Sequence, residues 1–88
     1  MKTMSETVKT LIERQMNLVA LEAQAYAMLQ DQQKSYLEIA MVIPEAGQIF
    51  SGVTMMAAHK NMELECHQKV LEALKRLYKD VKDVEDSN

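Results

Sequence analysis

The sequence predicts an all-α protein built as an antiparallel hairpin of two long helices. Three observations support this prediction. The 88 residues include only two Gly and one Pro, too few turn residues for an all-β domain. Apolar residues recur at steps of three and four on both sides of Pro44, as in amphipathic helices. Neither Gly nor Pro occurs before Pro44, so nothing in residues 1–43 breaks a helix.

The first helix is expected to begin at Thr3, because Thr3 and Glu6 have the spacing of a capping box. Apolar residues then follow one stripe from Val8 to Ile43. A continuous helix of about forty residues would be roughly 60 Å long. The alternative is a kink near residues 31–35, where the letters SYLE have the form of a second helix start.

Pro44 predicts the turn, because proline disfavours the helical conformation of the residue before it. We place the turn at residues 42–47; an irregular link through Gly47 and Gly52 is the alternative. The second helix has an apolar seam close to a seven-residue repeat. Its members are Val53, Met56 or Ala57, Lys60, Leu64, His67, Val70 or Leu71, Leu74, Leu77 or Tyr78, Val81 and Val84. Residues 1–88 form one domain, with fraying expected at 1–3 and 83–88.

The apolar stripes are too wide for a hairpin in which each helix has a single neighbour. Adjacent apolar pairs widen the seam, namely Leu11 with Ile12, Leu18 with Val19 and Val70 with Leu71. Wide stripes are typical of four-helix bundles. We therefore expect two hairpins to dimerise into such a bundle, and the alternative is a hairpin completed by a different helical protein.

Charge and cysteine content exclude several classes of function. The net charge is −3, and neither end of the chain carries a basic patch, so nucleic-acid binding is not expected. Cys66 is the single cysteine, which excludes an internal disulfide and is typical of a reducing compartment. No signal peptide is recognisable, so we expect a cytoplasmic protein, with secretion without a cleaved signal as the alternative.

Residues 39–58 carry one charge, that of Glu45, although exposed turns are usually polar. Their apolar side chains cannot all face one side of a hairpin. We therefore predict a small helical protein–protein interaction module of adaptor, chaperone-like or regulatory type. Membrane contact is an alternative, but a spanning helix is disfavoured because a carboxylate at mid-bilayer costs roughly 2.5–3.5 kcal/mol. The predicted partner-binding residues are Ile43, Ile49, Phe50, Val53, Met55 and Met56.

One group of polar residues on the second helix contains types that bind transition metals, namely His59, Glu63, Cys66 and His67. The Glu-x-x-His pattern of di-metal bundles is absent, so we expect neither metal nor another cofactor. We expect instead a polar layer in the seam, in which Glu22 pairs with His67. No nucleophile–base arrangement or phosphate loop is present, and no catalytic residues or enzyme activity are predicted. A metal-binding bundle and a small membrane-associated or secreted hairpin are the alternative functions.

Overall fold

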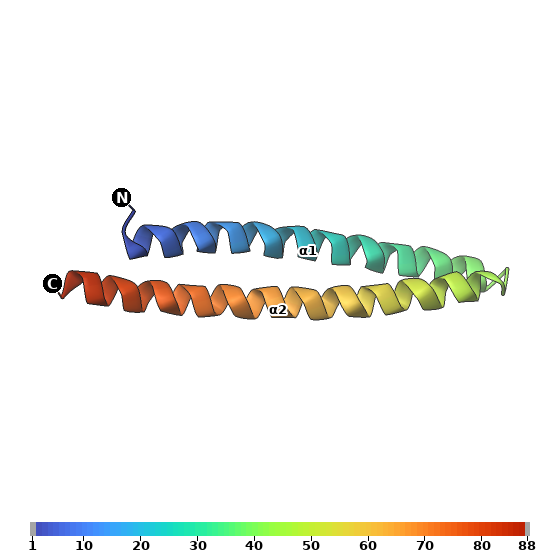
Figure 1. Cartoon of the computed structure of the whole chain (residues 1–88). Coiled ribbons are helices and arrows are strands. Elements are labelled where there is room, and N and C mark those ends of the chain that lie inside the picture. Colours follow the sequence, from blue (N-terminus) through green and yellow to red (C-terminus); the bar gives the residue numbers. More distant parts are fainter. Residues whose placement is uncertain (1, 88) are drawn as a thin grey trace.

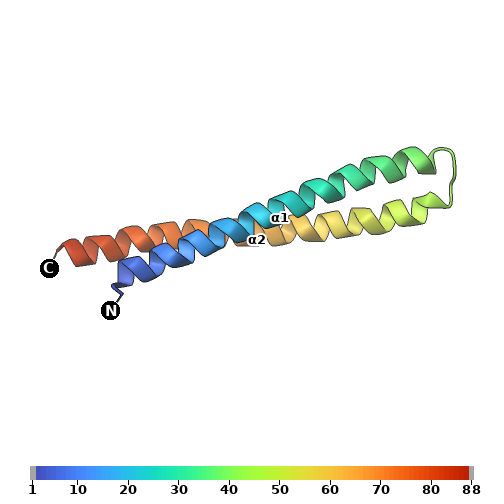
Figure 2. The same cartoon turned by 90° about the horizontal axis from the view of Figure 1, so that it is seen from above.

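The computed structural model describes residues 2–87 and confirms the predicted all-α hairpin. Helix α1 spans Met4–Ala40 and helix α2 spans Ala46–Asp86 (Figure 1). A short link reverses the chain, so the two helices lie side by side and antiparallel over their whole length. Figure 2 shows the same pair from above, with the two ends of the chain together and the link at the far end.

The molecule is a rod measuring 69 × 17 × 14 Å. Its radius of gyration is 19.7 Å. A compact domain of this length would have a radius of gyration of about 12 Å. In cross-section the hairpin therefore consists of two helices side by side, and among the described residues no third element covers either helix.

Helix α1 begins and continues for reasons that are visible in its side chains. Thr3 is the N-cap, and its Oγ1 accepts a hydrogen bond of 3.2 Å from the backbone N–H of Glu6, as the sequence predicted. The alternative of a second helix start near residues 31–35 is wrong, because α1 is continuous there. The hydroxyl of Ser35 donates to the carbonyl of Asp31 at 3.3 Å, so it is used inside the helix rather than as a cap.

The link between the helices contains Pro44, as expected, but the two glycines lie beyond it. The backbone N–H of Ile43 donates to the carbonyl of Ile39 at 2.7 Å, which closes the end of α1. Gly47 and Gly52 are both helical residues of α2 with negative φ. The alternative of an irregular link through them is therefore wrong. The turn at Pro44 already reverses the chain without a left-handed residue, so neither glycine is needed there.

The open end of the hairpin is tied together. The backbone N–H of Ser5 donates to Glu85 Oε1 at 3.0 Å, which joins the first turn of α1 to the last turn of α2. Helix α2 continues through Asp86, and fraying of residues 83–88 stays a prediction. Glu85 accepts from an N–H group at the start of α1, where helices leave such donors without an intrahelical partner. Residues 1 and 88 lie outside the described residues.

The interior of the hairpin is a single seam whose members alternate in steps of three and four, which are positions a and d of a heptad repeat. Every seam residue is buried or half-buried, but among the described residues only Val8, Ala46, Val53 and Ala57 are buried apolar residues. The interior is therefore thin. The seam consists of Ser5, Val8, Ile12, Gln15, Val19, Glu22, Tyr26, Leu29, Gln33, Tyr36 and Ala40 in α1, and Ala46, Phe50, Val53, Ala57, Lys60, Leu64, His67, Leu71, Leu74, Tyr78, Val81 and Glu85 in α2.

Candidate interaction surface

The six predicted partner-binding residues divide into an interior and an exterior group. Val53 is 8% exposed and Phe50 is half-buried, because both occupy seam positions. The other four are about half exposed or more, and they are Ile43, Ile49, Met55 and Met56. The exposed apolar surface at the turn therefore excludes Val53, which packs in the seam between the two helices.

Two further residues belong to this surface although the sequence prediction did not include them. Met41 and Val42 are each 81% exposed, which makes them the most exposed large apolar residues described. Both lie in the link, just before Pro44. Their position next to the proline was the available signal, because a side chain in the link has no second helix opposite it.

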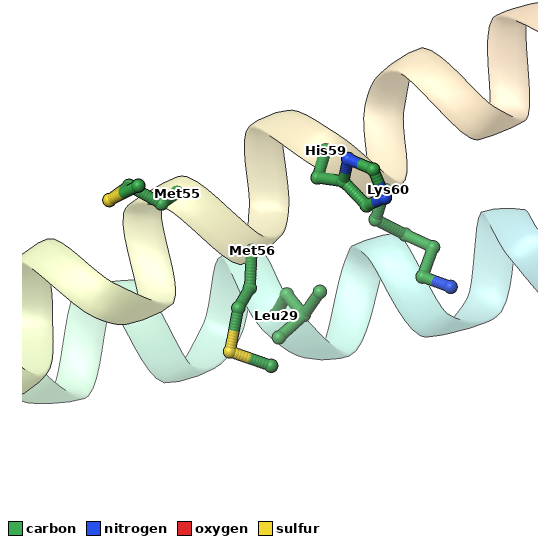
Figure 3. A pocket seen from close by; sticks show the side chains of 5 residues that line it. All are labelled: Leu29, Met55, Met56, His59 and Lys60. Carbon is green, nitrogen blue, oxygen red and sulfur yellow. The ribbon is translucent and has the colours of Figure 1, made fainter.

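An apolar groove lies beside the turn, between the two helices. It has a volume of about 530 Å³ and is lined by Leu29, Met55, Met56, His59 and Lys60. Figure 3 shows Met56 extending from α2 toward Leu29 of α1, while Met55 points away from α1. Methionine is flexible and polarizable, so two methionines at the rim suit an adaptable contact.

A second, smaller groove contains more polar side chains. It has a volume of about 290 Å³ and is lined by Gln30, Gln33, Lys34, Leu37 and Phe50. The amide of Gln33 donates to the hydroxyl of Thr54 at 3.1 Å. That hydroxyl donates in turn to the carbonyl of Phe50 at 2.8 Å. The amide of Gln33 is therefore partnered within the chain.

A polar cluster interrupts the seam next to the apolar groove. Lys60 Nζ lies 3.1 Å from Glu22 Oε2 and 3.1 Å from Glu63 Oε2. His59 Nε2 lies 3.0 Å from Glu63 Oε1. The hydrogen bond to Glu63, followed by Glu22, raises the pKa of Lys60, and the hydrogen bond from Lys60 lowers the pKa of Glu63. Both groups are therefore charged at neutral pH.

The predicted pairing of Glu22 with His67 is wrong. Glu22 contacts Lys60 instead, and its buried Oε2 lies 3.1 Å from the Lys60 ammonium nitrogen. His67 is paired with Gln15, whose Nε2 donates to the His67 carbonyl at 2.9 Å and lies 3.3 Å from Nδ1. The long side chain of Lys60 reaches Glu22, and a full positive charge is a stronger partner for a carboxylate than a neutral imidazole.

The four candidate metal ligands do not converge. His59 and Glu63 contact each other, but His67 points to Gln15 of α1 and Cys66 is an exposed free thiol. Within residues 2–87, no group of three or more His, Cys, Asp or Glu side chains is arranged to hold a metal ion. The spacing of the four residues is that of one helical face, but only His59 and Glu63 contact each other.

The Ser5–Glu85 contact predicts a pH dependence of stability. Hydrogen bonds from the Ser5 side chain and then from its backbone N–H lower the pKa of Glu85 below its ordinary value of 4.5. A lowered pKa in the folded state stabilises the fold above the ordinary pKa, and this contribution is lost as the pH falls through the folded value. Glu85→Gln should therefore lower the Tm at neutral pH, and the difference from wild type should vanish in strong acid.

Thermal melts followed by circular dichroism at several pH values measure this effect. Glu72→Gln is the matched control, because Glu72 is an exposed carboxylate on the same helix. A constant Tm difference between Glu85→Gln and wild type at all pH values would show that the contact does not titrate.

Neither helix has a stretch apolar enough and long enough for a bilayer crossing, as judged over residues 2–87. Comparison with protein families, with curated proteins and with solved structures found no match to this chain. The function is therefore argued from the side chains alone.

Proposed function

We propose that this protein is a small helical protein–protein interaction module, of adaptor, chaperone-like or regulatory type, that binds through apolar side chains at the turn end of the hairpin. In this proposal it is a binding protein and not an enzyme. It works in a reducing compartment such as the cytoplasm, in keeping with the free thiol of Cys66. Its full assembly is a four-helix bundle formed by two hairpins.

The observation that carries the proposal is the exposure of large apolar side chains around the turn. Burying apolar surface contributes roughly 25 cal/mol per Å², so contact with a partner would be favourable at each of these side chains. A contiguous apolar patch on a monomer usually marks an interaction site. The exposed fractions are 81% for Met41, 81% for Val42, 53% for Ile43, 51% for Ile49, 74% for Met55 and 58% for Met56.

The mechanism follows from the shape of the turn end. A partner helix would lay an apolar stripe into the groove between α1 and α2, where Leu29 and Met56 form the floor and rim. The two methionines adjust to partners of different shape.

Replacing two turn residues tests this function. We expect Met41→Ser combined with Met55→Ser to abolish binding to proteins that the wild-type hairpin retains from an extract of its own cells. Met62→Ser is the matched control, because Met62 is 64% exposed but lies on α2 beyond the groove. Quantitative mass spectrometry of the three retained fractions is the measurement. The same proteins at the same level on all three would contradict a binding role for the turn.

A further inference from the structure

A second apolar surface, which shares Ile49 and Met56 with the turn end, runs along one side of the hairpin at heptad position g. Each residue at this position directly precedes a seam residue at position a. Nine of these twelve residues are large apolar side chains with exposed fractions between 42% and 65%. We call this surface the g face. It comprises Met4, Leu11, Leu18, Ala25, Gln32 and Ile39 of α1 and Ile49, Met56, Glu63, Val70, Leu77 and Val84 of α2.

The two halves of the g face lie on the same side of the molecule. Because α1 and α2 are antiparallel, position g of one helix flanks position g of the other, and position e flanks position e (Figure 2). The apolar side chains therefore form one face on one side of the rod.

The opposite side of the hairpin has a different composition. In α2, every residue at position e is polar or glycine, and in α1 only Met16 and Leu37 are large apolar residues there. The position e side is therefore mainly polar, whereas the g face is mainly apolar. The position e residues are Lys9, Met16, Ala23, Gln30 and Leu37 in α1 and Gly47, Thr54, Asn61, Gln68, Lys75 and Lys82 in α2.

The heptad pattern indicates the kind of helical assembly to which this face belongs. A self-sufficient two-stranded coiled coil has apolar residues at positions a and d and charged residues at positions e and g. Here position g is apolar as well, which gives each helix an apolar face of three positions in seven. That pattern is characteristic of helices that face the core of a bundle. The hairpin thus has the sequence pattern of one half of a four-helix bundle.

The accessible area indicates the size of the missing partner. The hairpin exposes 6756 Å². A compact monomer of the same mass would expose about 5,200 Å², so the excess is about 1,500 Å² per chain. If two copies each lost this excess, the interface would bury about 3,000 Å² in total, which is within the range of obligate homodimers. A short peptide could not cover a face that runs along a rod of 69 Å.

We infer that the g face is the dimer interface, and that its occupant is a second copy of this chain. The second copy has an apolar face of the same length and width, as a two-fold symmetric interface requires. This inference rests on the four-helix bundle of the proposed function. It places the contact between the two hairpins on the g face, which does not include Met41 or Met55 of the turn.

Glu63 is the only charged residue of the g face. Its carboxylate is held by Lys60 and His59, so the polar cluster would enter the interface with its charges paired. Desolvation of these charges opposes association, even when they are paired. Replacing Glu63 with leucine makes the α2 half of the face apolar throughout, and it should strengthen the dimer.

Sedimentation equilibrium tests the inference with matched variants. The wild-type chain should have twice its mass of 10.0 kDa at micromolar concentration. Leu18→Glu with Val70→Glu should have the mass of one chain, since each glutamate would lie within the apolar interface. Met16→Glu, at a site of similar exposure on the position e side, should remain a dimer.

The opposite change provides a measurement that does not depend on how well a destabilised variant folds. Glu63→Leu should lower the dimer dissociation constant tenfold or more, and Glu65→Leu, on the outer side of α2, should leave it unchanged. A single-chain mass for the wild type at 100-fold higher concentration, roughly 100 μM, would overturn the inference. So would a dimer that survives both glutamates on the g face.

These results are separable from those of the turn variants. Loss of partner binding in Met41→Ser with Met55→Ser, with the mass of two chains retained, would support both surfaces. Retained partner binding in Met41→Ser with Met55→Ser, together with loss of the dimer in Leu18→Glu with Val70→Glu, would support the interface and refute the function proposed for the turn.

Discussion

Val53→Asp is expected to unfold the hairpin, whereas Met55→Asp, two residues further along α2, is expected to change its stability by less than about 0.5 kcal/mol. Val53 is 8% exposed and Met55 is 74% exposed. A carboxylate at Val53 would be removed from water with no cation opposite it, at an effective cost of several kcal/mol. At Met55 the same carboxylate would remain hydrated.

The expected size of this effect follows from the total stability. A domain of 88 residues has a free energy of unfolding of roughly 4–13 kcal/mol at typical values per residue. The interior of this hairpin is thin, so its stability should be in the lower part of that range. A loss of several kcal/mol would then leave a largely unfolded chain.

Urea denaturation followed by far-UV circular dichroism measures both variants under the same conditions. Val53→Asn is a useful control, because it is similar in size to the aspartate but has no charge. A Val53→Asp protein that unfolds at the same urea concentration as wild type would show that Val53 is not an interior residue. It would then return to the list of partner-binding residues.

The second large effect is a change in Tm in the polar cluster that one substitution lowers and a second substitution restores. Lys60→Leu alone should lower the Tm by several degrees, because it leaves the carboxylates of Glu22 and Glu63 without the ammonium group between them. The combination of Lys60→Leu with Glu22→Leu should restore the Tm to wild type or above it. Removing one partner of a buried pair leaves an uncompensated charge, whereas replacing both with apolar residues does not.

A double-mutant cycle with Glu22→Leu, Lys60→Leu and the combined variant measures this coupling. Thermal melts at one protein concentration are needed, because dimerisation would make the Tm depend on concentration. Additive effects of the two substitutions would mean that Glu22 and Lys60 do not interact across the seam.

The sequence predicted the elements of the fold more reliably than the contacts between them. The Thr3 cap, the turn at Pro44 and most of the seam of α2 were predicted because they depend on residues close together in the chain. The exception is Val84, which is 57% exposed, whereas Glu85 occupies the seam position. The pairing of Glu22 depends on which residue of α2 comes within reach after the turn closes. A shift of seven residues in register, or about two helical turns, replaces His67 with Lys60, and local spacing does not specify it.

The interaction surface was predicted only in part, for a related reason. The uncharged segment around Pro44 correctly indicated exposed apolar side chains at the turn, but the list included Val53, which faces α1 in the seam. Leu11, Leu18 and Val70 were recognised as residues that widen the stripes. The sequence could not show that these wide stripes of α1 and α2 meet on the same side of the hairpin.

The amino-acid sequence by itself determined that this chain forms two long helices joined at Pro44, and that their apolar stripes are wider than a two-helix seam. These properties follow from helical periodicity and from the backbone of proline, and both act over a few residues. Only the tertiary structure decided which polar residues pair across the seam and that the apolar flanks of the two helices lie on the same side of the hairpin. Both depend on the antiparallel register of α1 and α2, which is set by packing over the whole length of the rod.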